Sequence, residues 1–113
     1  MKNSERSSKS VSMILDSAIV IARSIVDGKI NMLEGVRKLC DLHASLGSPQ
    51  IDAFYVLKAI DSETDHFPLG SIRTKCSEQY LLAADEELRL YLGDQSTIIM
   101  EACSTIIYLY EDR

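Results

Sequence analysis

The residues best placed for chemistry form a short acidic segment near the middle of the chain. Asp61, Glu63 and Asp65 stand at alternate positions and are followed by His66. Alternating carboxylates are typical of the first ligands of a calcium loop. That loop also needs glycine where His66 stands and a bidentate glutamate where Ile72 stands. The spacing therefore argues against calcium, and we predict an acidic surface with no metal and no other cofactor.

His66 is the one histidine that we expect in a polar loop, so it is the first candidate for a general base or a ligand. No second histidine, suitable cysteine or nucleophile motif accompanies it, and acid–base catalysis needs such partner groups. A hydrogen-bonding brace is the favoured interpretation. The segment then reads as a helix end followed by a turn in which Ser62 and Thr64 bond to the backbone. We predict no catalytic residue and no enzyme activity.

A second acidic group follows in the last third of the chain, at Asp85, Glu86 and Glu87. Asp85 has a side chain typical of a helix N-cap, and acids in the first turn interact favourably with the helix dipole. Their additional role would be electrostatic attraction of a partner. The predicted partner-binding residues are Asp61, Glu63, Asp65, His66, Asp85, Glu86 and Glu87.

The charge is distributed unevenly along the chain. Residues 1–50 contain seven Lys and Arg against five Asp and Glu, whereas residues 51–113 contain five against twelve, giving +2 and −7. Binding to nucleic acid needs a basic surface, so the acidic half argues against it, including binding by a helix-turn-helix DNA reader. A cationic partner is favoured. An acidic surface that serves only solubility is the alternative.

Helical spacing of apolar residues defines the elements that position these side chains. It predicts main helices over about residues 11–27, 32–46, 50–61 and 86–110, with short helical turns at 72–75 and 78–83. Gly28 and Gly47 predict the ends of the first two helices, and Asn31 with Glu34 predicts an N-cap. The third helix is apolar over most of its circumference, as a central helix would be. The last helix is expected to continue through Gly93.

This pattern predicts an all-α protein, a compact bundle of four main helices with one or two short helices. Residues 1–9 are polar and predict a disordered tail, and residues 10–113 predict a single helical domain. Three cysteines without CxxC spacing favour free thiols in a reducing cytoplasm. The polar N-terminus, and the charges of Asp16 and Arg23 in the first apolar stretch, predict neither a signal peptide nor a membrane span.

Two segments carry a family resemblance. IARSIVDGKINMLEGVRKL (residues 21–39) and AIDSETDHFPLGSIR (residues 59–73), together with the last helix, resemble small all-helical bacterial proteins. Some of these are similar to immunity proteins of contact-dependent growth inhibition systems. The resemblance implies a cytoplasmic antitoxin that binds the C-terminal toxin domain of a delivered effector, often a nuclease, and blocks its active site. Nuclease sites are lined with cations that bind phosphate, so an acidic cover is complementary.

Three hypotheses therefore stand. The first is an inhibitory protein of this kind, whose partner is a basic toxin domain and which contacts neither nucleic acid nor membrane. The second is a small metal-binding or enzymatic protein that uses the segment from Asp61 to His66. The third is a structural homo-oligomer in which the apolar third or last helix packs against a copy of itself. The sequence leaves the oligomeric state open.

Overall fold

The computed structural model describes the backbone of residues 2–112 and the side chains of residues 10–112. The elements are α1 (Lys2–Val26), α2 (Met32–Ser45), α3 (Asp52–Thr64), the 3-10 helix η1 (Gly70–Lys75) and α4 (Glu78–Glu111). No strand occurs within residues 2–112. The predicted all-α bundle of four main helices with a short extra one is confirmed. The backbone of residues 2–9 belongs to α1, so the first helix starts earlier than the predicted residue 11. The disordered tail predicted over residues 1–9 stays a prediction.

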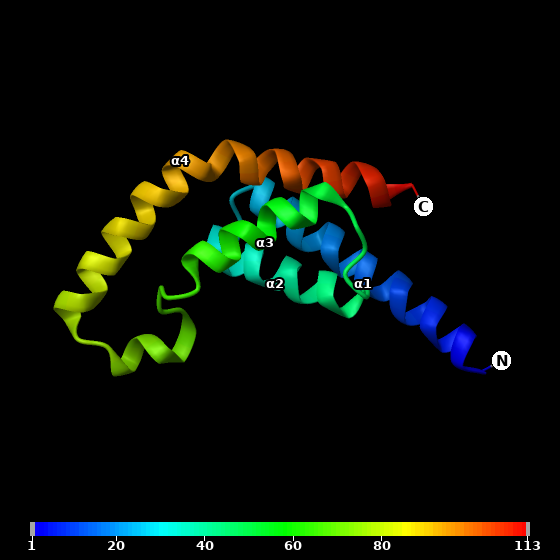
Figure 1. Ribbon diagram of the computed structural model, residues 1–113, viewed down its shortest axis with the longest axis horizontal. Coiled ribbons are helices and arrows are strands. Elements are labelled where there is room, and N and C mark those ends of the chain that lie inside the picture. The colour runs from blue at the N-terminus through cyan, green and yellow to red at the C-terminus, as the bar shows by residue number, and fades with distance from the viewer. Residues whose placement is uncertain (1, 113) are drawn as a thin grey trace.

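The chain runs back and forth along one axis, so that consecutive α-helices are antiparallel (Figure 1). α1 packs against α2 and α4, and α3 packs against the same two helices. Each helix therefore has two neighbours, and the four enclose a shared interior, as in an up-down-up-down bundle. Because α3 and α4 are neighbours, the acidic end of α3 lies beside the acidic last helix.

Local signals in the sequence set the ends of the first two helices. Gly28 has a φ of +69° and Gly47 a φ of +86°, which is the left-handed region that glycine adopts at little cost. At the start of α2, Asn31 Oδ1 accepts a hydrogen bond from the backbone N–H of Glu34 at 3.0 Å. These ends were predicted because each depends on neighbouring residues only.

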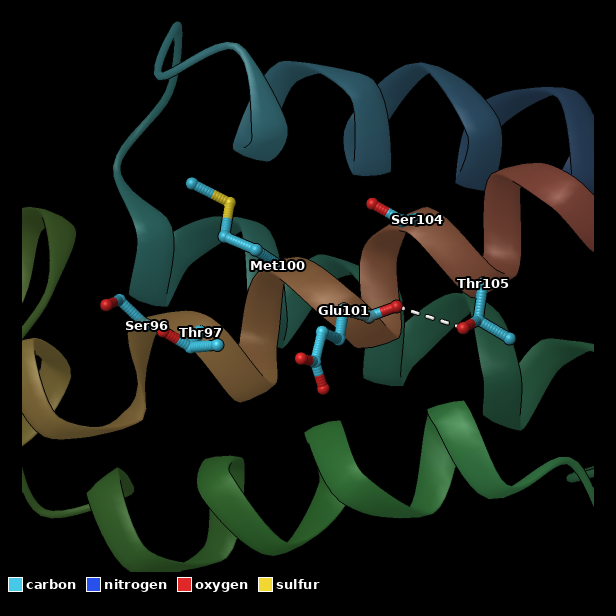
Figure 2. Close-up of a pocket in the computed structure, with 6 residues that line it drawn as sticks. All are labelled: Ser96, Thr97, Met100, Glu101, Ser104 and Thr105. Carbon is cyan, nitrogen blue, oxygen red and sulfur yellow. Dashed lines mark hydrogen bonds between the residues drawn. The ribbon is translucent and has the colours of Figure 1, made fainter.

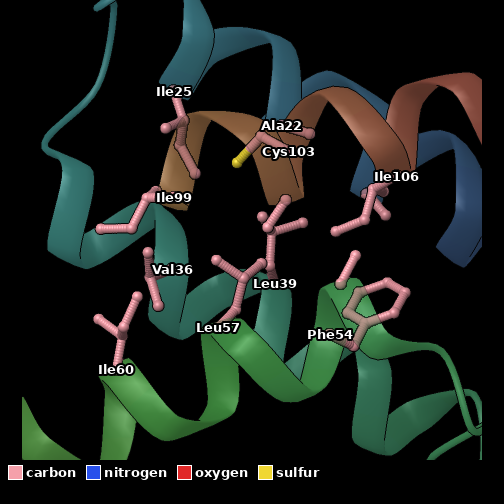
Figure 3. Close-up of a cluster of buried hydrophobic side chains, with 13 residues drawn as sticks. Ala22, Ile25, Val36, Leu39, Phe54, Leu57, Ile60, Ile99, Cys103 and Ile106 are labelled. Atoms are coloured by element: carbon pink, nitrogen blue, oxygen red, sulfur yellow. The ribbon is translucent and has the colours of Figure 1, made fainter. Parts of the chain in front are cut away.

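Apolar side chains from all four α-helices fill the interior (Figure 3). Ile25 of α1, Leu39 of α2, Leu57 of α3 and Ile106 of α4 are at most 1% exposed. Burial of one such side chain contributes about 1.5–3 kcal/mol. Phe54 adds a second fully buried group from α3. The central position predicted for that helix is nevertheless wrong, because α3 packs mainly against α2 and α4 and its opposite side is exposed to solvent.

The three cysteines are free thiols, as predicted. Cys103 is buried in the core, while Cys40 and Cys76 are half-buried. Burial raises the pKa of Cys103 to about 11. Burial first, and then the nearby carboxylates of Asp61 and Asp41, raise the pKa of Cys40 to about 12. Both thiols therefore stay protonated at neutral pH and behave as small apolar side chains.

The third helix is longer than predicted. It continues past Asp61 to Thr64, whose buried hydroxyl donates to the carbonyl of Ile60 at 2.6 Å and closes the last turn. Asp61 and Glu63 are therefore helical, and the loop predicted from Ser62 is wrong over residues 62–64. Thr64 continues the buried side of the helix, and that tertiary burial cannot be read from its polar side chain.

The last helix is also longer than predicted, because the break expected before Asp85 is absent. α4 begins at Glu78, where the N-cap Ser77 accepts from the N–H of Tyr80 at 3.1 Å, and it continues through Gly93. The predicted N-cap role of Asp85 is therefore wrong. Residues 78–92 contain neither glycine nor proline, so nothing in the backbone stops the helix there.

The first half of α4 extends beyond the four-helix body. α4 bends near its middle, and its first half with η1 forms an arm at the end of the molecule (Figure 1). A second, smaller apolar cluster connects this arm to the start of α2. Its members are Leu33, Phe67 and Ala84, with Leu69, Leu88 and Leu92 packed against them.

Candidate functional site

Asp61 lies on the last turn of α3 beside α2, where it pairs with an arginine. Its Oδ1 is 3.5 Å from Arg37 Nε. Arg37 Nη2 also donates to the carbonyls of Thr64 at 2.6 Å and Phe67 at 3.3 Å. The guanidinium thus satisfies the carbonyl of Thr64, which ends α3 without a helical partner, and that of Phe67 in the turn that follows. Arg37 therefore partly neutralises the carboxylate of Asp61, which weakens the attraction of Asp61 for a cation on another molecule.

Glu63 reaches the neighbouring helix instead. It accepts a hydrogen bond from the hydroxyl of Tyr91 on α4. Burial, and then this carboxylate, raise the pKa of Tyr91 to about 12, so the hydroxyl remains a donor at neutral pH. The bond ties the end of α3 to the middle of α4.

Asp65 and His66 follow the helix and are both exposed. Asp65 is the C-cap of α3. The ring centre of His66 lies 4.1 Å from that of Phe67, which is only 5% exposed. The contact seen for His66 is therefore ring packing, whereas a hydrogen-bonding brace was expected. Within residues 10–112, no group of three His, Cys, Asp or Glu side chains could hold a metal ion.

Two of the three acids at residues 85–87 are paired with arginines. Arg73 of η1 donates to both carboxylate oxygens of Asp85, at 2.8 and 2.7 Å, and Arg89 donates to both of Glu86, at 3.0 and 2.7 Å. These hydrogen bonds hold the pKa of Asp85 and of Glu86 below its usual range. Glu87 is exposed and makes no ion pair with another described residue.

The predicted site residues therefore have different surroundings. Asp61, Glu63, Asp85 and Glu86 face partners within the chain, whereas Asp65, His66 and Glu87 face solvent. Within the described residues, no hydrogen bond connects one of the four paired acids to another. Contact of any of the seven with a partner stays a prediction.

The sequence reasoning included Glu87 but missed two further acids that form a row with it along α4. Glu87, Asp94 and Glu101 recur at intervals of seven residues, which places them on one side of the helix. All three are exposed, and none forms a side-chain hydrogen bond or ion pair with another residue of the described range. We call them the acidic row. The seven-residue spacing is visible in the sequence, but beyond residues 85–87 only the apolar positions of this helix entered the prediction.

Glu101 also borders a shallow groove between the two acidic helices, which we call the α3–α4 groove. Asp52 of α3 stands among its lining residues with Glu101 of α4, and apolar side chains lie between them. The complete lining is Asp52, Ala53, Val56, Ile98, Glu101, Ala102 and Thr105. Ile98 is 44% exposed although it is aliphatic. The groove thus combines a small apolar floor with carboxylates.

A second hollow shares Glu101 and lies over the outer surface of α4 (Figure 2). Its lining is mostly small and polar, with Ser96, Thr97, Met100, Glu101, Ser104 and Thr105. In the close-up, Glu101 points toward α3 and Met100 toward α1 (Figure 2). Thr105 Oγ1 donates to the carbonyl of Glu101 at 3.0 Å. Glu101 therefore stands at the edge between the outer surface and the α3–α4 groove.

Comparison with known proteins gives no relative. No family model, curated protein or solved structure matches the chain. Among the described helices, none combines the length and apolar character needed to cross a membrane. Geometry and charge therefore bear on partner binding, whereas an immunity role rests on the resemblance of residues 21–39 and 59–73 alone.

Proposed function

We propose that the protein binds a basic partner protein through its acidic α3–α4 side, and that it serves as a cytoplasmic immunity protein that blocks a toxin domain. The observation that carries the proposal is the acidic row of Glu87, Asp94 and Glu101, whose carboxylates have no partner among the described residues. A helix holds them in fixed positions, so binding costs little ordering entropy. The phosphate-binding site of a nuclease toxin would be a complementary surface.

The spacing of the acidic row favours binding over catalysis. Seven helical residues span about 10 Å at about 1.5 Å per residue. Carboxylates that far apart are too distant to act together on one reacting atom or to hold one metal ion, since both need groups within about 3 Å of a common point. They suit a row of lysine and arginine side chains on another protein.

The distribution of charge along the chain also indicates that a basic partner approaches the α3–α4 side. Residues 1–50 carry +2 and residues 51–113 carry −7, so a basic partner is attracted to the α3–α4 side and repelled from the other. Such attraction mainly raises the association rate, and it weakens with added salt. A nucleic acid, which carries negative phosphates, would be repelled from this side.

The immunity role is tested by a growth competition. Susceptible bacteria that carry either the expressed protein or an empty vector are mixed with cells of the protein's own source that deliver toxins by contact. We expect the expressing cells to survive many-fold better, because the toxin is bound before it reaches its substrate. Equal survival of both, with the protein present at normal levels, would contradict the immunity role.

A further inference from the structure

The α3–α4 groove offers apolar surface that the four-helix bundle leaves uncovered. Ala53 and Ala102 are small and buried, so they leave space between the helices, and Val56 and Ile98 flank that space. The lining residues on α4 run from Ile98 to Thr105. That length corresponds to about 10 Å, or two helical turns. The groove is therefore long enough for one or two apolar side chains of an incoming helix.

The lining of the groove is acidic without any compensating base. Asp52 and Glu101 contribute carboxylates, and no lysine or arginine stands among the residues that line it. Asp94 continues the acidic row beyond it, seven residues before Glu101 on α4. An occupant that carries positive charge beside its apolar side chains is therefore favoured over a neutral or acidic one.

A second copy of this chain fits the groove poorly. The chain carries a net charge of −5, and its residues 51–113 carry −7. Two copies that meet through their α3–α4 sides would bring these like charges together, which opposes association. The complementary occupant is a different protein.

We infer that the α3–α4 groove is the docking site for a helical segment of the partner protein, one with a short apolar ridge flanked by lysine or arginine. The inference rests on the proposed partner-binding function and specifies both the contact surface and the element that enters it. Recognition would use apolar side chains that repeat at i and i+4 on the partner helix, which face the same side. The flanking cations would meet Asp52, Asp94 and Glu101.

The direct test uses a blocked 14-residue model peptide of alanine and lysine that carries two leucines four residues apart. It is titrated into the isotopically labelled full chain while the backbone amide resonances are followed by NMR. We expect the largest shifts at Val56, Ile98 and Ala102. A peptide with glutamate in place of lysine should cause none. Shifts confined to other surfaces, or no shifts at all, would overturn the groove as the site.

Two substitutions on the same helix separate the groove from the general acidic surface. Ile98→Ser removes an apolar side chain from the groove, whereas Leu90→Ser removes one that is 57% exposed and lies outside it. We expect the first to weaken peptide binding about tenfold, as the loss of a buried anchor does, and the second to leave it unchanged. Equal effects of the two substitutions would overturn the inference.

The growth competition distinguishes failure of this inference from failure of the proposed function. If Ile98→Ser still protects cells as well as the natural protein does, the groove is not the docking site, while the immunity role stands. If the natural protein gives no protection, the immunity role fails. Groove resonances that shift with protein concentration alone would identify a second copy as the occupant and overturn the inference.

Discussion

Arginine side chains decide which acids of this protein remain available to a partner. Each of four arginines pairs with a carboxylate, and the pairs are Arg23 with Glu111, Arg37 with Asp61, Arg73 with Asp85 and Arg89 with Glu86. The planar guanidinium matches a carboxylate in geometry as well as charge. Acids that looked most available in the sequence, such as Asp61 and Asp85, are therefore partly used inside the fold.

Arg37 gives a prediction at this scale. The substitution Arg37→Met removes its hydrogen bonds to the carbonyls of Thr64 and Phe67 and leaves Asp61 without its cation. We expect the free energy of unfolding to fall by about 1–3 kcal/mol, measured by urea denaturation. Lys38→Met, at the exposed neighbouring position, is the control and should change it by less than about 0.5 kcal/mol. Equal stability of the two variants would show that Arg37 does not hold this turn.

Among the elements, α4 has the largest part in the proposed function. It supplies buried residues to the core, such as Ile99 and Ile106, and its exposed side carries the acidic row. The apolar period that places it in the core was predicted from the sequence. Its continuity through residues 83–85 was not, because Asp85 has a typical N-cap side chain, and only the packing of η1 brings Arg73 to it.

The contact between α1 and α2 gives a prediction at the scale of elements. A Cβ added to Gly35 would lie 2.6 Å from Cγ1 of Ile25, a side chain that is 1% exposed and has little room to move. We expect Gly35→Ala to lower the free energy of unfolding by up to about 2 kcal/mol net, because the overpacking itself costs about 1–3 kcal/mol. This effect outweighs the better helix propensity of alanine, which is worth about 1 kcal/mol.

Gly93 provides the matched control on α4. Nothing lies within 4 Å of a Cβ added there, so Gly93→Ala should raise the free energy of unfolding by about 0.5–1 kcal/mol through helix propensity alone. Thermal or urea unfolding of both variants measures the difference. A Gly35→Ala protein that is as stable as Gly93→Ala would contradict the close contact of α1 with α2.

For the whole molecule, patterns of neighbouring residues predicted the helical bundle better than they predicted which acidic side chains are free on its surface. Helix periods and caps such as Gly28 and Asn31 depend on residues close in the sequence, so the bundle followed from them. The pairing of Asp61 with Arg37, and of Glu63 with Tyr91, joins residues on different helices. Such pairs depend on packing, and the sequence alone left these acids as candidates for a free surface. The difference in net charge between the two halves of the chain, in contrast, can be read from the sequence alone.

The role of the acidic row is tested most directly by measuring how tightly the protein binds its partner. The partner is the protein that the tagged chain retains from a lysate of its source cells at low salt. The triple variant Glu87→Gln, Asp94→Asn, Glu101→Gln is compared with a variant that loses three exposed acids from the first half of the chain, Asp27→Asn, Glu34→Gln, Asp41→Asn. Each variant loses three negative charges, so the two differ only in where on the molecule these charges are removed.

We expect the first variant to bind the partner about 10- to 100-fold more weakly, at roughly 0.5–1 kcal/mol per exposed carboxylate. The second should bind like the natural protein, and added salt should reduce the difference between them. Equal losses in the two variants would mean that net charge alone matters. Unchanged binding by the first variant would contradict the role of α4 as the partner-binding helix.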